Sequence, residues 1–456
     1  MNATIDIAQY QARRSRLLSM VNVNAIVIIP SAQEVTRSND TEYPFRQNSD
    51  FYYLTGFNEP DCFLLLSSKG PSNKGSSNKA LSSNSEQTAS QSTLLLRPKD
   101  DLAEIWHGRR LGITDAPKHL LVDVAYSVDD IDEILPDMLD GHDYLYYSLG
   151  DNLQADDLVQ CAMAMCKQAP KQSKQAPSSI VDVSHIIHNM RLIKSAEEIA
   201  VMQQSADISC KAHKSAMAAC KPGVYEYQLE AIILHSFAMQ GARYAAYNTI
   251  VGGGENGCIL HYVENKDALV DGEVVLIDAG SEYQGYAADI TRTFPVNGRF
   301  SPAQKEIYNL VLSTQLACIN QLKPGRTIAE AMQTAICMIT QGLLDLGILS
   351  GELQSCIDED AHKAFFMHGL GHYLGLDVHD VGIYKDNGHD KALESGMVMT
   401  VEPGIYISKK ANVPEKYKGI GVRIEDNIVI TTKGNEVLTR HAPKTVEDIE
   451  ALMATS

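Results

Sequence analysis

Four carboxylic acids occur in the C-terminal half of the chain at the ends of strand-like runs. Two similar segments, Gly272–Gly280 and Gly396–Gly404, each consist of a glycine, an apolar β-rich run, an acid and a second glycine. Each is followed by another strand-like run with an acid of its own. The four acids are Asp278 and Asp289 in the first pair of runs, and Glu402 and Glu425 in the second. Because oxygen ligands suit hard cations, the pattern predicts a cage for such ions.

The first pair of acids has a predicted geometry. If Val274–Gly280 and Tyr286–Phe294 form a hairpin about a turn near Tyr283–Gln284, Asp278 lies opposite Asp289. The Cβ atoms of directly opposite cross-strand neighbours are about 4.5–5.5 Å apart, and like charges at such positions destabilise a sheet. Unpaired acids among apolar residues are also costly to bury. Divalent ions would remove both costs, and two ions about 3.5–4 Å apart need carboxylates at such a separation. The alternative, solvated acids at strand ends, explains less well why the pattern occurs twice.

A second internal repeat indicates an ancient duplication. A Lys-Pro-Gly turn separates two helical stretches in each half, and acidic strands follow in both halves. The turns are Lys221–Gly223, between Ile199–Cys220 and Tyr227–Gln240, and Lys323–Gly325, between Ile307–Leu322 and Ile328–Leu346. We expect the two halves to face each other and to bring the acidic strands together at a pseudo-twofold axis.

Histidines are concentrated beside the second pair of acids. The glycine-rich segment from Phe366 to Asp380 contains His368, His372 and His379, and His261 precedes the first acidic strand. Histidine is the commonest metal ligand and the side chain best suited to proton transfer near neutral pH. A lone histidine is more often a satisfied core residue. Three beside a carboxylate frame predict one metal ligand and two residues that handle protons or bind substrate.

These motifs resemble the pita-bread metallopeptidase family, which includes methionine aminopeptidase, prolidase and aminopeptidase P, and most closely its bacterial aminopeptidase P branch. In the C-terminal half the resemblance rests on Asn248–Gly252, Gly257–Tyr262, Ile277–Gly280, Asp289–Phe294, His368–His379, Thr400–Gly404 and Arg423–Asp426. In the N-terminal part it rests on Phe45–Phe57 and Glu104–Arg110. It implies an α/β (α+β) fold: a small N-terminal α/β domain followed by a catalytic domain of two duplicated α+β halves.

The resemblance also implies roles for individual residues. The implied metal ligands are Asp278, Asp289, His372, Glu402 and Glu425. Asp289 and Glu425 would bridge two metals, Asp278 would hold one of them, and His372 and Glu402 would complete the other. The implied catalytic residues are His261, His379 and Glu402, and the implied substrate contacts are His368, Tyr406 and Arg423.

The chemistry of amide hydrolysis agrees with this set. The reaction needs a nucleophile at neutral pH and stabilisation of a tetrahedral oxyanion. A two-metal site can hold a bridging hydroxide that attacks the carbonyl, while Glu402 accepts and returns a proton. Proline offers no N–H, so ring shape and carbonyl contacts must identify it. We therefore expect an aminopeptidase with two divalent ions that cleaves the bond between an N-terminal residue and a following proline. One nitrogen among oxygen ligands favours Mn²⁺.

Composition limits the possible partners and compartments. The chain has 456 residues, enough for two domains, and a formal net charge of −18, which argues against nucleic acid or an anionic membrane surface as a partner. No apolar run reaches the ~18 residues that span a bilayer, and the N-terminus lacks a signal-peptide pattern. The nine cysteines are scattered without CxxC spacing, and most lie in apolar contexts typical of buried, reduced thiols. These features predict a cytoplasmic protein.

Two segments have the composition of connectors. Residues 67–91 are rich in Ser, Asn, Gly and Lys and separate the strand-like runs Cys62–Leu66 and Thr93–Leu96, which predicts an enlarged hairpin loop. Residues 167–179 have linker composition. The sequence therefore predicts an N-terminal domain over residues 1–179 and a catalytic domain over residues 180–456.

Three questions stay open from the sequence. A prolidase shares the metal site but requires a dipeptide, and a non-catalytic peptide-binding relative would share only the fold. The resemblance implies a dimer or tetramer, in which Trp106, the only tryptophan, could reach a neighbour's active-site cleft; a core position is the alternative. The stretch Lys385–Lys391 lacks the arginines that the family often has near the substrate, so its effect on peptide preference is open.

Overall fold

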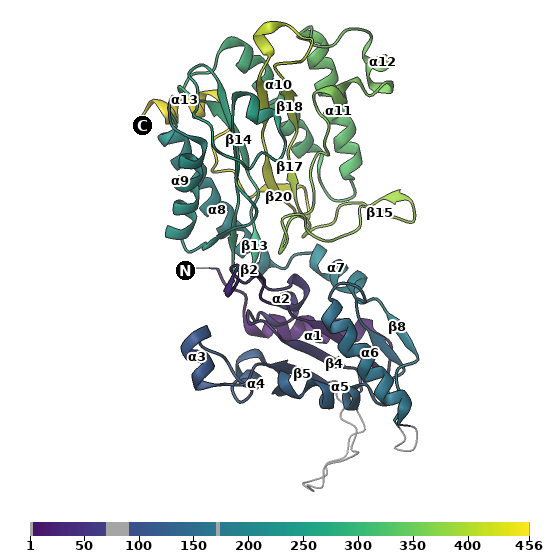
Figure 1. Ribbon diagram of the computed structural model, residues 1–456. Coiled ribbons are helices and arrows are strands. Elements are labelled where there is room, and N and C mark those ends of the chain that lie inside the picture. The colour runs from purple at the N-terminus through teal and green to yellow at the C-terminus, as the bar shows by residue number, and fades with distance from the viewer. Residues whose placement is uncertain (1–2, 70–90, 170–173, 456) are drawn as a thin grey trace. The chain divides into compact units, whose positions relative to one another are not determined.

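The computed structural model describes residues 3–69, 91–169 and 174–455, which form two compact units (Figure 1). One unit is Ile5–Met190, and the other is Arg191–Ser456 with Met1–Thr4. The sequence predicts a domain boundary after residue 179. That boundary stays a prediction. The predicted insertion at 67–91 lies almost wholly outside the described residues, and so does part of the predicted linker at 167–179.

The N-terminal unit contains a mixed sheet in the order β6-β5-β4-β1-β7-β8. Its strands are β1 (Ala25–Pro30), β4 (Phe63–Ser67), β5 (Gln91–Leu96), β6 (Val124–Ser127), β7 (Tyr144–Tyr146) and β8 (Ser179–Val181). The predicted hairpin is confirmed, because β4 and β5 pair antiparallel with Leu65 opposite Thr93. The helices are α1 (Ile7–Met20), α2 (Ser49–Thr55), α3 (Asp101–His107), α4 (Ala116–Leu120), α5 (Ile131–Leu139), α6 (Leu153–Gln168) and α7 (Ser184–Leu192). This is the small α/β fold that the sequence predicts.

Two helix pairs of the C-terminal unit confirm the predicted internal repeat. They are α8 (Ala196–Ala219) with α9 (Glu226–Met239), and α10 (Pro302–Gln321) with α11 (Ile328–Asp345). The glycines of the two Lys-Pro-Gly turns, Gly223 and Gly325, have φ of 87° and 82°, in the left-handed region that glycine tolerates best. Their N–H groups donate to the carbonyls of Leu269 and Leu393, 2.8 and 2.9 Å away. Each turn is therefore tied to the chain just ahead of an acidic strand.

The acidic strands form two hairpins, each interrupted near its middle. The first consists of β11 (Val274–Asp278), β12 (Ser281–Tyr283), β13 (Tyr286–Ala287) and β14 (Thr291–Pro295), and the second of β17 (Val398–Val401), β18 (Gly404–Ile407), β19 (Ile420–Arg423) and β20 (Asp426–Ile430). The four acids lie at or within these interruptions. Figure 1 shows α8 and α9 on one side of these strands and α11 on the other. An interrupted strand turns its side chains away from a regular sheet face, so both hairpins direct their acids toward a common site.

The predicted pairing of Asp278 with Asp289 is wrong. Asp278 pairs with Thr291, and Asp289 lies two residues before that partner, so the two acids are diagonal neighbours on the same face. The turn contains Gln284 and Gly285, with φ of 50° and 80°, as a two-residue hairpin turn requires. This turn lies one residue later than predicted, which moves every cross-strand partner by two positions.

The remaining elements complete the C-terminal unit and the exposed edges. They are β2 (Thr36–Ser38) and β3 (Thr41–Glu42) in the N-terminal unit, and β9 (Tyr244–Ala245), β10 (Ile250–Gly253), α12 (Leu353–Asp358), β15 (Lys385–Asp386), β16 (His389–Asp390), β21 (Asn435–Val437) and α13 (Val446–Ala454) in the C-terminal unit. Within the described parts of the chain, no helix combines the length and apolar character needed to cross a bilayer. The cysteines are all free, and most of them are buried, as predicted.

Gly280 allows the two strands of the first hairpin to approach closely. A Cβ atom at this position would lie 1.7 Å from the carbonyl oxygen of Ala288. We predict that Gly280→Ala lowers the free energy of unfolding by about 1–3 kcal/mol or more, because backbone must move to relieve the overlap. Gly434→Ala is the matched control, since nothing lies within 4 Å of its Cβ position. Urea unfolding of both variants tests this, and equal midpoints would contradict it.

Candidate active site

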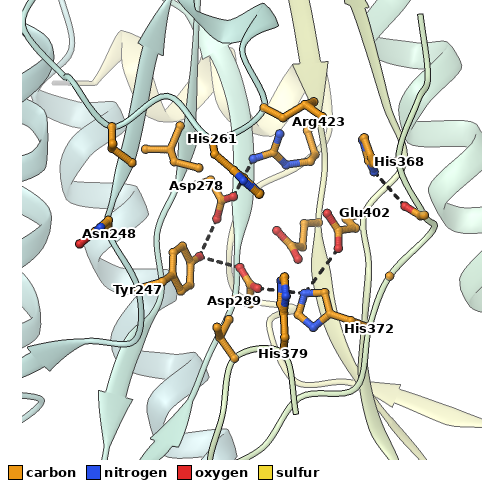
Figure 2. Close-up of a pocket in the computed structure, with 17 residues that line it drawn as sticks. Tyr247, Asn248, His261, Asp278, Asp289, His368, His372, His379, Glu402 and Arg423 are labelled. Carbon is orange, nitrogen blue, oxygen red and sulfur yellow. Dashed lines mark hydrogen bonds and ion pairs between the residues drawn. The ribbon is translucent and has the colours of Figure 1, made fainter. Parts of the chain in front are cut away.

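A cavity of about 700 Å³ in the C-terminal unit brings the predicted acids and histidines together. Figure 2 shows their side chains pointing into it from both halves of the unit. The predicted site residues that line it are His261, Asp278, Asp289, His368, His372, His379, Glu402, Arg423 and Glu425. The expectation that the two acidic hairpins meet is therefore confirmed, while the role of each residue stays a prediction.

Three of these side chains are arranged as a metal site. Ligand atoms of Asp289, His372 and Glu425 all lie within 4.8 Å of one another. The Nε2 atom of His372 is 3.4 Å from Asp289 Oδ2 and 3.5 Å from Glu402 Oε1. Its Nδ1 atom is 2.9 Å from the carbonyl oxygen of Tyr373, which can only accept, so Nδ1 carries the proton. The lone pair of Nε2 therefore faces the acids, as a metal-binding imidazole requires.

The acids fit metal ions because their charges are poorly compensated by protein. Burial, together with the neighbouring Glu425, raises the pKa of Glu402 to about 8. Burial and the nearby carboxylates also raise the pKa of Asp289 and of Glu425 well above the usual range. Moreover, Oε1 of Glu425 is buried and has no hydrogen-bond partner among the described residues. A buried carboxylate oxygen without a partner is costly, and a divalent cation would satisfy it.

Asp278 is held by two other groups. Arg423 Nη2 lies 2.6 Å from its Oδ2 atom, and the hydroxyl of Tyr247 lies 2.6 Å from its Oδ1 atom. The same hydroxyl is also 2.6 Å from Oδ1 of Asp289. Burial and the two nearby charges raise the pKa of Tyr247 well above its usual value, so the phenol stays protonated and can donate. Tyr247 therefore joins the two acids of the first hairpin.

Sequence reasoning missed Tyr247 and several supporting groups. Tyr247 directly precedes the Asn248–Gly252 motif, and Ile250 on β10 pairs with Asp278 on β11, so its place beside the acidic strand was the available signal. The hydroxyl of Thr400 also escaped notice. It donates to Oε1 of Glu402 at 3.2 Å and accepts the N–H of His372 at 3.0 Å. These polar neighbours fix the orientation of the acids and the histidine.

His368 is committed to a different network. Its Nε2 atom is 2.8 Å from the hydroxyl of Tyr406, which accepts a hydrogen bond from Arg423 Nη1 at 3.0 Å. Its Nδ1 atom lies 2.8 Å from the carbonyl oxygen of Gly369. Burial and the Arg423 charge lower the pKa of His368 to about 4, so the ring is neutral near pH 7. Both nitrogens are thus engaged away from the acids, which separates His368 from His372.

The other two predicted histidines differ in their surroundings. The ring of His379 stacks at a tilt against His372, with 4.1 Å between centroids. Burial, followed by the neighbouring His372, lowers the pKa of His379. His261 is exposed, and no hydrogen bond or ion pair holds its ring within the described part of the chain. The two imidazoles are therefore positioned by different means.

An ion-pair cluster supports the backbone next to His379. Asp380, with its side chain 1% exposed, contacts Arg191 Nη2 at 2.5 Å and Lys194 Nζ at 2.8 Å. Arg191 also pairs with Asp377 at 2.7 Å. Removing one partner of a buried pair is strongly destabilising, so this cluster holds the His379 segment firmly.

The lining of the cavity also includes apolar side chains. Its aliphatic lining residues are Ile250, Leu260, Val263 and Val378. A site that combines apolar lining residues with a few convergent polar groups is typical of small-ligand binding.

Trp106 belongs to the other unit and does not line this cavity. Its side chain is 81% exposed, and α3, on which it lies, contains no buried residue. The alternative that Trp106 is a core residue is therefore wrong for the single chain. Its contact with substrate stays a prediction.

Comparisons with known proteins agree on one family. The sequence matches Metallopeptidase family M24 over residues 200–432 and the Aminopeptidase P N-terminal domain over residues 10–146. The Xaa-Pro aminopeptidase of Escherichia coli K12 is 48% identical over 448 residues, or 98% of each chain. A zinc-substituted E. coli aminopeptidase P in complex with product has a TM-score of 0.94 at 48% identity, with 99% of each chain covered. Proline aminopeptidase P II from Yersinia pestis has a TM-score of 0.93 at 50% identity, over 99% of this chain and all of that one.

The geometry predicts which substitutions release metal. Glu425→Ala and His372→Ala should weaken metal binding by more than the roughly 10–100-fold typical for loss of an outer-shell partner, because each removes a ligand atom. His368→Ala is the matched control, since both of its nitrogens are engaged elsewhere, and it should retain metal. Metal content per chain after dialysis, measured by mass spectrometry, tests this. Release of metal from the His368 variant in place of the His372 variant would overturn the assignment.

Proposed function

The chain belongs to the Xaa-Pro aminopeptidases of metallopeptidase family M24, and we propose that its cavity binds two metal ions and cleaves the bond before a proline in the second position of a peptide. The observation that carries this proposal is the buried acid cluster with its partnerless Glu425 oxygen. The 48% identity over nearly the whole chain to a curated Xaa-Pro aminopeptidase supports the substrate class.

We assign the ligands as the resemblance implies. Asp289 and Glu425 would bridge the two metals, Asp278 would bind one, and His372 and Glu402 would complete the other. The short distances among Asp289, His372 and Glu425 support the shared position. A donor set with one nitrogen and otherwise carboxylate oxygens favours hard ions, so we propose Mn²⁺ as the native metal.

The chain's own residues would divide the work of hydrolysis. When bound, the metal ions would make water acidic enough to serve as a nucleophile and would polarise the substrate carbonyl. Glu402, whose pKa burial and Glu425 raise in the metal-free chain, is placed to accept a proton and return it to the leaving nitrogen. His261 and His379 line the same cavity and would donate to the developing oxyanion or orient the amide.

Recognition of proline would depend on shape more than on hydrogen bonding. The nitrogen of the scissile Xaa-Pro bond has no proton to donate, so no acceptor can identify it. The aliphatic residues that line the cavity, Val378 and Leu260 among them, would contact the pyrrolidine ring. Arg423, Tyr406 and His368 form a hydrogen-bonded edge that would contact the peptide carbonyls.

We propose self-association through the exposed surface of α3, with a second copy of this chain as the occupant. Leu102, Ile105 and Trp106 on this helix are 73, 75 and 81% exposed. Exposed apolar side chains on one short helix are typical of a contact surface. We further propose that Trp106 contacts the peptide bound by the second copy, and that the free cysteines reflect a cytoplasmic, reducing compartment.

A peptide panel tests the activity. The metal-loaded protein should cleave Xaa-Pro-Xaa tripeptides and spare matched peptides with alanine in the second position, because the cavity selects the ring. His261→Ala and His379→Ala should each lower kcat by about 10²–10⁴-fold and retain metal, since they handle protons and do not bind metal. Cleavage confined to Xaa-Pro dipeptides would identify a prolidase, and metal binding without turnover would leave a binding protein.

Trp106→Ala tests the proposed contact between copies. We expect a higher KM for longer peptides with unchanged metal content and thermal stability, because an exposed side chain contributes little to the fold of the single chain. Leu149→Ala is the control, since this side chain is also exposed in the N-terminal unit, at 57%. A large loss of stability without any change in peptide-length preference would contradict this role.

A further inference from the structure

The backbone of its own segment is the main determinant of where His261 lies. The ring is exposed and makes no hydrogen bond or ion pair within the described residues. Without such a bond, the direction of the ring depends strongly on the backbone that carries it. The groups that hold the segment from Gly253 to Asp267 therefore determine where this imidazole lies.

We propose that Glu226, which does not line the cavity, is the positioning residue for His261. The inference rests on the proposed function, in which His261 acts on the scissile amide. Glu226 is the first residue of α9 and is fully buried. Its side-chain hydrogen bonds all go to the His261 segment.

The carboxylate of Glu226 closes the segment at both ends. Its Oε1 atom accepts the N–H of Gly253 at 2.8 Å and the side-chain amide of Asn256 at 3.0 Å. Its Oε2 atom accepts the hydroxyl of Tyr262 and the N–H of Asp267, both at 2.9 Å. Gly253 and Asp267 are the two ends of the segment, and Tyr262 directly follows His261. One side chain thus fixes the base of the loop and the residue next to the histidine.

Because the Glu226 carboxylate is buried, it requires the hydrogen bonds from both ends of the segment. Glu226 forms no ion pair within the described residues, so its four hydrogen bonds are what stabilise the carboxylate. A buried charge without such partners is very costly. Any other arrangement of the segment would remove donors from the carboxylate, and the conformation that places His261 at the cavity is favoured accordingly.

The other side of the segment is tied to the second half of the unit. Glu255 accepts the hydroxyl of Ser408 at 2.8 Å and the N–H of Lys409 at 2.7 Å. The backbones of Gly257 and Gly421 lie very close together. A Cβ atom at Gly421 would be 2.3 Å from the carbonyl oxygen of Gly257. The segment is therefore held between two surfaces, and Glu226 provides the attachment to the first half.

A double-mutant cycle with Glu226→Gln and His261→Ala tests the proposal. The side-chain amide of the glutamine replaces one carboxylate oxygen with an NH₂ group. The two donors that bind that oxygen therefore lose their acceptor, and the hydrogen bonds to one end of the segment are lost. We expect Glu226→Gln to lower kcat by about tenfold or more, within the range for loss of proton transfer, with little change in KM or metal content. In the His261→Ala background the same substitution should lower kcat by less than about twofold, because the residue it positions is already gone. Independent, multiplicative losses would overturn the proposal.

Glu198→Gln is the matched control. Glu198 is also buried in the first half and accepts a tyrosine hydroxyl, from Tyr286 at 2.7 Å, and a backbone N–H, from Ser195 at 2.8 Å. Whatever it costs in activity should combine independently with His261→Ala, since it does not touch the His261 segment. Amide hydrogen exchange provides a second readout. In the Glu226 variant the amide of Gly253 or of Asp267, whichever faces the glutamine nitrogen, should lose protection, and in the Glu198 variant both amides should keep it. Unchanged protection of both amides in the Glu226 variant would contradict the proposal.

Two further outcomes keep the tests separate. If Glu226→Gln does not fold, Tyr262→Phe removes a single donor and should give a smaller loss of kcat that also disappears in the His261→Ala background. Loss that persists in that background would overturn the positioning role. A wild-type protein that cleaves no Xaa-Pro peptide would contradict the proposed function itself, whereas an active wild type with independent losses would contradict this inference alone.

Discussion

Burial of several carboxylates in one cavity is the constraint on which the rest of the C-terminal unit depends. Burial and mutual repulsion raise the pKa of Asp289, Glu402 and Glu425, so their charged forms are strongly disfavoured without counter-charge. Arg423 supplies one cation by pairing with Asp278 at 2.6 Å. The other acids receive hydrogen bonds, and within the described residues no lysine or arginine pairs with them, while Nε2 of His372 lies 3.4 Å from Asp289 and 3.5 Å from Glu402. Two divalent ions would balance the set, which is why this arrangement suits a metallopeptidase.

The fold brings these acids together through an interrupted hairpin that occurs in both halves of the unit. Buried hairpin strands carry each acid into the interior, and an interruption of the ladder turns it out of the sheet. Because the same helix-turn-helix and hairpin occur in both halves, a single structural solution delivers acids from two directions. Glycines allow close backbone approach beside the acids: a Cβ at Gly280, in the interruption of the first hairpin, would lie 1.7 Å from the Ala288 carbonyl oxygen, and a Cβ at Gly371, in the histidine-rich segment, would lie 2.1 Å from that of Thr400. The glycines therefore serve the metal site by permitting close backbone contact.

Most of this architecture could be predicted from the sequence, and the rest could not for identifiable reasons. The echoed turns and acidic runs predict the helix pairs and the meeting of the hairpins, because local patterns carry that information. The pairing of Asp278 was predicted two positions away from its true partner, since the register depends on which residues adopt positive φ in the turn. Tyr247 was missed because its partners, Asp278 and Asp289, are remote in sequence. The available signal was indirect: Tyr247 directly precedes the Asn248–Gly252 motif, whose strand pairs with the strand of Asp278.

The two histidines that we propose as catalytic, His261 and His379, differ in exposure and in how the protein holds them. His379 is stacked on His372, and its backbone is held by the ion pairs of Asp380, so its ring is fixed by direct contact with protein. His261 is exposed and lines the cavity, where we propose that the peptide binds. Side-chain contacts there would have to be broken, or would block the substrate, each time a peptide bound. Attachment of the backbone through a buried carboxylate avoids that conflict: it fixes the direction of the imidazole and leaves both ring nitrogens available to the substrate.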